Sequence, residues 1–185
     1  MKKIENYENV QASSGGFERP SANGYCIEII GVKDIPFDAN TGKGDYLKID
    51  YDICHGNFKG YYTKQHERFG GDWFANFIRS YKETALGMFK HFTNCIEESN
   101  AGYKWDWNEN GLVGKFVGVV FGEEEYRKSN GDIGVKLVVK DIKTVEQILS
   151  GDFKIPAIKK LKENTNSAFS PIQFDEISDD DLPFN

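Results

Sequence analysis

Few residues of the types that catalyse reactions or bind metals have, in this sequence, the spacing that such a site needs. The run HERFG at 66–70 begins like the helix of a zinc protease but has Gly70 where the second histidine belongs. His91 and Cys95 are four residues apart in a segment with helical spacing and could share a metal ion, but two ligands do not close a metal site. We therefore expect no catalytic residues, no bound metal and no cofactor, and we expect that the protein is not an enzyme.

Aromatic residues beside cations give a stronger signal. The chain has 14 Phe, 9 Tyr and 3 Trp, and several of them neighbour Lys or Arg where strand alternation or a loop predicts exposure. Flat rings stack on the bases of single-stranded nucleic acid, and cations neutralise its phosphates. The pattern predicts a nucleic-acid-binding surface that includes Tyr46, Lys48, Lys59, Tyr61, Tyr62, Arg79, Lys82, Tyr103, Lys104, Trp105 and Trp107.

The alternative for each of these aromatic side chains is that it packs in the hydrophobic core. We assign Phe58 and Trp73 to the core, and Tyr46, Trp105 and Trp107 to the surface. Exposed Trp and Tyr also stack on sugars, so a carbohydrate-binding module is a further alternative.

The elements that must position these residues are mostly strands. Alternation of apolar and polar residues is typical of a strand with one buried side, and it predicts strands over 24–34, 45–53, 57–64, 115–126 and 133–142. Apolar residues at three- and four-residue steps predict a helix within 72–99, and 144–152 reads as a short helical piece. Three strands, a helix and two strands are the elements of an OB-fold, so we expect a mainly β chain that forms a five-stranded barrel.

The charge is unevenly distributed along the chain. The formal net charge is −6, from 23 bases and 29 acids, and residues 167–185 hold five of the acids and no base. The remainder, with 23 bases and 24 acids, has a net charge of −1 and can still display a local basic surface. We expect a flexible arm over 1–23, an OB-fold domain over 24–161, and a disordered linker with an acidic tip over 162–185.

The environment is inferred from the cysteines and the hydropathy. Three widely spaced cysteines are typical of reduced thiols in a cytoplasmic protein. No stretch of 18 apolar residues stands in the sequence, so we expect no membrane span.

The final residues, SDDDLPFN, resemble the acidic C-terminal tip of bacterial single-stranded-DNA-binding proteins. That resemblance implies an OB-fold, a linker, and a tip that docks replication and repair enzymes. Phe184 would fill an apolar pocket, and the acids would contact a basic rim. In that family the tip ends at the Phe, whereas Asn185 follows here. The matching residues are Asp179, Asp180, Asp181, Leu182, Pro183 and Phe184.

A second resemblance covers 24–161. Segments such as SYKETALGMFKHF, LVGKFVGVVFGEEEY and GDFKIPAIKKL are similar to small proteins from phages and prophages of Gram-positive bacteria, which are taken to act in single-stranded-DNA binding or replication. We therefore expect a protein that coats single-stranded DNA in replication, recombination or repair in the bacterial cytoplasm. The bacterial single-stranded-DNA-binding proteins that the tip resembles form tetramers, so this resemblance leaves open whether the chain forms a homo-oligomer. The alternative is a replisome adaptor that binds proteins but not DNA.

Overall fold

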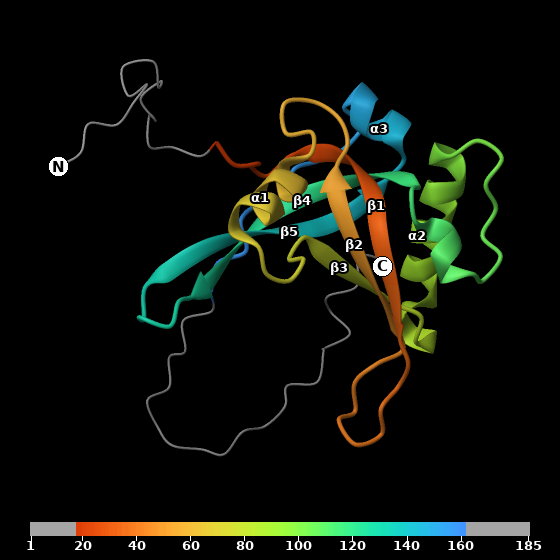
Figure 1. Cartoon of the computed structure of the whole chain (residues 1–185), viewed down its shortest axis with the longest axis horizontal. Coiled ribbons are helices and arrows are strands. Elements are labelled where there is room, and N and C mark those ends of the chain that lie inside the picture. Colours follow the sequence, from red (N-terminus) through yellow and green to blue (C-terminus); the bar gives the residue numbers. More distant parts are fainter. Residues whose placement is uncertain (1–17, 162–185) are drawn as a thin grey trace, which may run out of the picture.

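The computed structural model describes residues 18–161, which form one curved antiparallel sheet with helices around it (Figure 1). The chain is mainly β, and the strands follow the order β3-β2-β1-β4-β5 across the sheet. The strands are β1 (Gly24–Ile35), β2 (Tyr46–Ile53), β3 (Asn76–Ser80), β4 (Phe116–Arg127) and β5 (Ile133–Lys143). The helices are α1 (Tyr61–Phe69), α2 (Leu86–Ser99) and α3 (Val145–Ser150), with short 3-10 turns at Glu83–Ala85 and Glu109–Leu112.

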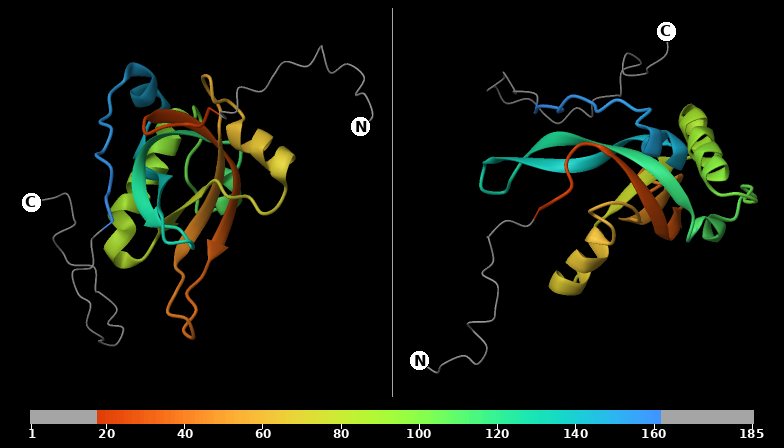
Figure 2. Two further views of the ribbon diagram at one scale, coloured as in Figure 1. Left: turned by 90° about the vertical axis from the view of Figure 1, so that its left-hand side faces the viewer. Right: turned by 90° about the horizontal axis from the view of Figure 1, so that it is seen from above.

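The sheet curls into a partial barrel, as the left view of Figure 2 shows. Five antiparallel strands with a helix between the third and the fourth are confirmed. Within residues 18–161 no ladder of hydrogen bonds joins β3 to β5, so the sheet is open between these two strands. The closed barrel expected from the order of the elements is therefore not formed, and we refer to the gap between β3 and β5 as the seam.

The third strand lies elsewhere than predicted. Residues 57–64 form a turn and the start of α1, and β3 lies instead within the 72–99 segment that helical spacing favoured. Gly60 adopts a left-handed φ of 69°, which breaks an extended chain at this point. The predicted helix is thereby shortened to α2, which begins at Leu86.

The start of α1 is held by a carboxylate from β2. Gly60 supplies no side-chain cap. Asp52, only 6% exposed, instead accepts hydrogen bonds from the N–H groups of Tyr62 and Thr63 (both 3.0 Å) and from the Thr63 hydroxyl (2.6 Å). These are N–H groups that a helix leaves without partners in its first turn, and the negative charge also suits that end of the helix dipole. Asp52 therefore converts an aromatic run with strand-like alternation into a helix.

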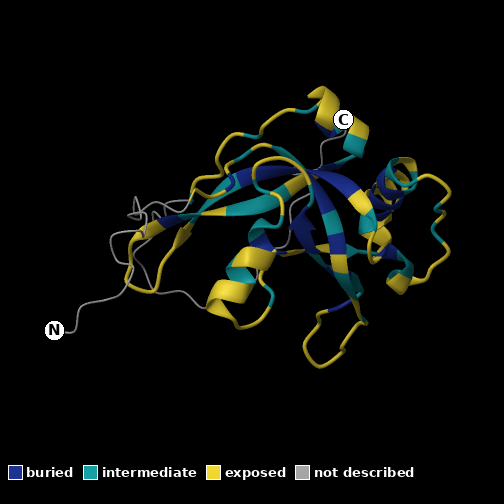
Figure 3. Ribbon diagram, turned by 45° about the horizontal axis from the view of Figure 1, so that its top comes forward, coloured by how far each residue is buried: buried dark blue, intermediate teal, exposed yellow. Residues whose placement is uncertain are grey.

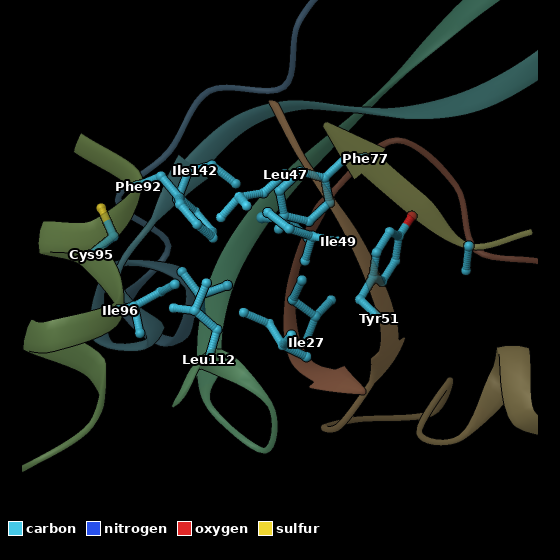
Figure 4. Close-up of a cluster of buried hydrophobic side chains, with 14 of the residues drawn as sticks. Ile27, Leu47, Ile49, Tyr51, Phe77, Phe92, Cys95, Ile96, Leu112 and Ile142 are labelled. Carbon is cyan, nitrogen blue, oxygen red and sulfur yellow. The ribbon is translucent and has the colours of Figure 1, made fainter. Parts of the chain in front are cut away.

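The core lies on the inner side of the curl and follows the predicted alternation of β2. Leu47, Ile49, Tyr51 and Ile53 are all buried, and they meet side chains of β1, β3, β4 and α2 (Figure 4). On α2, the apolar residues whose three- and four-residue spacing predicts the helix include Phe89, Phe92 and Ile96, which are buried. Leu86, which begins the same series, is 44% exposed. Phe58 and Trp73 pack against this core, which confirms their assignment.

The outer half of the β4–β5 hairpin, residues 123–136, projects from the body; we call it the β4–β5 arm (Figure 1). A turn at Asn130–Gly131 closes it, with Gly131 at a φ of 91°. Beyond Val120, β4 no longer pairs with β1, and residues after α3 run along the edge left free there. The Lys159 N–H donates to the Glu123 carbonyl oxygen, and the Glu125 N–H donates to the Lys159 carbonyl oxygen (both 2.9 Å). The predicted arm over 1–23 is largely outside the described residues, and the linker and tip over 162–185 lie wholly outside them.

Replacing the capping carboxylate tests this account of α1. Asp52→Ala leaves buried N–H groups without acceptors, and we expect it to lower the free energy of unfolding by about 2–4 kcal/mol, measured in urea. Glu67→Ala, on an exposed position of the same helix, is the control and should cost less than about 0.5 kcal/mol. Equal effects of the two substitutions would contradict the capping role.

Candidate nucleic-acid interface

The outer face of β1, β2 and β3 brings predicted site residues together. The inner residues of β2 are buried, so Tyr46 and Lys48 must point outward, and both are half-buried there. In the strand register Lys48 lies between Lys33 of β1 and Ile78 of β3. These two rows form what we call the outer face: Lys33, Lys48 and Ile78 in one row, and Ile35, Tyr46 and Ser80 in the other.

The charges and apolar groups on this face are accessible. Ile78 is 52% exposed, and the exposed Lys33 stands directly opposite Lys48. Lys48 Nζ lies 3.5 Å from a carboxylate oxygen of Asp50, a weak pairing for side chains that both contact solvent. Figure 3 shows how exposed and half-buried positions alternate with buried ones along these strands. The face thus combines an aromatic ring, two aliphatic groups, a hydroxyl group and two ammonium groups.

The loop between β1 and β2 adds a ring that the sequence analysis missed. Phe37 is 52% exposed, and the Lys82 ammonium lies 5.7 Å from its ring centroid. The backbone holds this ring outward: the Phe37 N–H donates to the Asp45 carboxylate (3.1 Å), and Gly44 has a φ of 123°. A Cβ at Gly44 would lie 2.2 Å from the Pro36 carbonyl oxygen, so only glycine fits there. A phenylalanine within a run of turn-forming residues was the signal for it.

A second aromatic group lies beside α2. Trp107 is 75% exposed and has an unusual φ of 66°, and its ring stacks on Phe89 at a centroid distance of 6.4 Å. Trp105 is half-buried, with its ring 5.9 Å from Phe89. Tyr81 also contacts Phe89, and burial together with its hydrogen bond to Asp34 raises the pKa of its hydroxyl to about 12. We call Tyr81, Phe89, Trp105 and Trp107 the α2 aromatic cluster.

The one cation predicted for this loop, Lys104, is paired with a neighbouring carboxylate. Lys104 Nζ lies 2.7 Å from a carboxylate oxygen of Glu97, and that hydrogen bond lowers the pKa of Glu97. Tyr103 is half-buried, with the Lys115 ammonium 4.9 Å from its ring centroid. Tyr103 and Lys104 therefore lie near Trp105 and Trp107 in sequence but offer no unpaired charge to a ligand.

The remaining predicted residues lie away from the outer face. Lys59 is exposed in the turn before α1, and Tyr61 and Tyr62 belong to α1 itself. Tyr62 is 8% exposed, and burial raises its pKa to about 12. Arg79 points inward, 4.9 Å from the Phe77 ring centroid, and desolvation lowers the pKa of its guanidinium to about 10. Asp179–Phe184, the predicted protein-docking tip, are outside the described residues.

The histidine and cysteine considered as metal ligands lie in contact on α2. His91 Nε2 is 2.9 Å from the Ile142 carbonyl oxygen and 3.6 Å from Cys95 Sγ. In the part of the chain that the structure describes, no group of three or more His, Cys, Asp or Glu side chains is arranged to hold a metal ion. Over the same residues, no helix has the length and apolar character needed to cross a membrane.

Comparison with known proteins assigns this chain to no family. No protein-family model matches the chain, and no curated protein matches it in sequence.

The exposure of Trp107 gives a direct prediction. We expect Trp107→Phe to remove most of the tryptophan emission that acrylamide quenches easily, because the other two indoles are half-buried. Trp73→Phe is the control, since that indole donates to the Ala75 carbonyl oxygen (3.0 Å) and packs on the core. Unchanged acrylamide quenching in Trp107→Phe would show that the exposed orientation is wrong.

Proposed function

We propose that this protein binds single-stranded DNA through the outer face of an OB-fold-like domain. The observation that carries the proposal is the register that places Lys33, Lys48 and Ile78 in one row beside Tyr46. The strand order supports the fold assignment, because pairing β3 with β5 would complete a five-stranded OB barrel. In OB-folds, oligonucleotides lie on the face of strands two and three and between the β1–β2 and β4–β5 loops.

The chemistry of the face suits a single strand better than a duplex. Unpaired bases expose ring faces that Tyr46, Phe37 and Ile78 can contact, with about 1–3 kcal/mol for each stacked base. Lysine ammonium groups neutralise phosphates without reading sequence, so binding weakens as salt rises. A duplex hides its ring faces and would keep only the phosphate contacts.

The β4–β5 arm extends the proposed surface. Tyr126 is 40% exposed, and Arg127 and Lys128 are exposed beside it. Lys136 and Lys140, nearer the body, pair instead with Glu124, and the hydrogen bond from Lys140 lowers the pKa of that carboxyl group. The end of the arm therefore offers a ring with two cations, in the position of the β4–β5 loop that OB-folds use.

We further propose that the acidic tip recruits replication, recombination and repair proteins in the bacterial cytoplasm, as its resemblance implies. The alternative function, an adaptor that binds proteins but not DNA, is favoured by the α2 aromatic cluster. That cluster is apolar, and Lys104 in its loop is already paired with Glu97. It therefore offers a protein partner an exposed apolar contact surface.

Fluorescence anisotropy of labelled oligo-dT at several salt concentrations tests the proposal. We expect tight binding that weakens with salt and that equal-length duplex does not displace. Lys33→Ala/Lys48→Ala should reduce the slope of log K against log salt by about 1.4, since each lost phosphate contact contributes about 0.7. The matched control, Lys90→Ala/Lys154→Ala, removes two exposed lysines from outside the face and should leave the slope unchanged. Absence of binding by folded protein at low salt would contradict the proposal.

Removing the tip tests whether its acids compete with DNA. Residues 175–185 carry five acids, which are expected to occupy the same cations as phosphates when no partner is present. A chain that ends at residue 174 should bind oligo-dT more tightly at low salt, and this difference should shrink as salt rises. Equal affinities at low salt would overturn the competition.

A further inference from the structure

The seam between β3 and β5 holds a groove of about 430 Å³. One wall is Leu137, Val138 and Val139 of β5. The remainder is mostly aromatic and comes from β2, α1, β3 and the segment just before β3: Tyr51, Tyr61, Tyr62, Phe77 and Phe74. The lining opposite β5 is therefore dominated by aromatic rings.

One of these rings is unusually accessible for a groove residue. Phe74 is 58% exposed, and within residues 18–161 its one ring contact is near-perpendicular, with Tyr62 at a centroid distance of 5.7 Å. Tyr61, the first residue of α1, is half-buried and lines the same groove, with its ring centroid 5.2 Å from that of Tyr62. A ring so exposed contributes little to the core and remains available to a flat ligand.

Polar groups stand at the mouth of the groove. Arg19 lines it, and the positive charge of Arg19 opposes the rise that burial causes in the pKa of Tyr61. Asn76 also lines it, and its side-chain amide donates to the Phe74 carbonyl oxygen (3.2 Å), which leaves its own carbonyl oxygen as an acceptor. The groove thus combines ring faces, one hydrogen-bonding amide and one cation.

The groove adjoins the row of the sheet next to the outer face, because the last residue of that row, Asn76, also lines the groove. In the strand register Asn76 lies beside Asp50, which in turn lies beside Gly31. A strand of DNA that crosses β1, β2 and β3 therefore reaches Asn76 at the edge of the sheet and meets the groove next.

The edge of β3 is poorly suited to an added peptide strand, the other occupant that an open seam could take. Strand addition needs free backbone N–H and C=O groups along the edge. Here the Asn76 N–H already donates to the Phe74 carbonyl oxygen (3.1 Å), and the Ile78 carbonyl oxygen accepts from the Arg79 guanidinium (3.0 Å). The ring content and the cation favour a nucleotide instead.

We propose that the seam is a base-binding subsite: one base of the bound strand enters the groove and stacks on Phe74 and Tyr61, with its phosphate beside Arg19. This inference rests on the proposed single-stranded-DNA binding. It assigns the opening in the barrel a role, because a closed barrel would have no place for the base.

The test uses the full-length chain and the shortest oligo-dT that retains full affinity, so that the strand binds in one register, with a single 2-aminopurine placed at each position in turn. Stacking on a ring quenches this fluorescent base, so one position should be quenched more strongly than its neighbours. Phe74→Ala should abolish that extra quenching and weaken binding about tenfold, within the range for one stacked base. Phe74→Leu keeps the apolar bulk and should lose the quenching as well, which covers the case in which the alanine variant unfolds.

Phe69→Ala is the matched control, because Phe69 is 70% exposed at the far end of α1 and does not line the groove. It should retain both affinity and quenching. Tight DNA binding with the same quenching in the Phe74 variants would overturn the subsite and leave the proposed function standing. Weaker binding by these variants without any loss of quenching would assign Phe74 to support of the fold or to a peptide contact, which also overturns the subsite. Absence of DNA binding by the wild-type chain would overturn both proposals.

Discussion

The alternation of side chains along β2 is the constraint on which the rest of the structure depends. Its inner residues, among them Ile49 and Tyr51, are buried in the core that β1, β3, β4 and α2 share. A shift of one residue would bury Lys48 and Asp50 and expose the core, so the register is strongly specified. The same alternation fixes what lies outside: Tyr46 and Lys48 on the outer face, and Asp52 at the start of α1. Core, helix cap and candidate interface thus share one strand.

Much of the fold could be predicted because the periodicity of apolar residues within each element indicates its type. Period-two patterns located β1, β2, β4 and β5, and the spacing of Phe89, Phe92 and Ile96 located α2. The part of the fold that was predicted wrongly, α1 and β3, depends on contacts between residues distant in sequence. Residues 57–64 alternate like a strand, but a carboxylate from β2 draws them into a helix. The strand β3 has only five residues and turns Arg79 inward, so its alternation was too short and too polar to recognise.

The candidate site likewise contains residues that the local sequence pattern places and residues that only long-range pairing places. Tyr46 and Lys48 follow from their own strand, whereas Lys33 and Ile78 join them only through register with β1 and β3. A bulge between Ile29 and Gly31 shifts the pairing of β1, and no local pattern reveals it. The sequence likewise placed Lys104 beside two tryptophans but could not show its pairing with Glu97, seven residues earlier. Local patterns therefore named candidate residues, and long-range pairing decided which of them share a surface.

Mapping backbone amide chemical shifts by NMR during titration with unlabelled oligo-dT tests the central claim most directly. The proposed function predicts shift changes that saturate together at Lys33, Tyr46, Lys48 and Ile78, with further changes in the β1–β2 loop and the β4–β5 arm. Changes confined to the α2 aromatic cluster, or none at low salt, would contradict binding on the outer face.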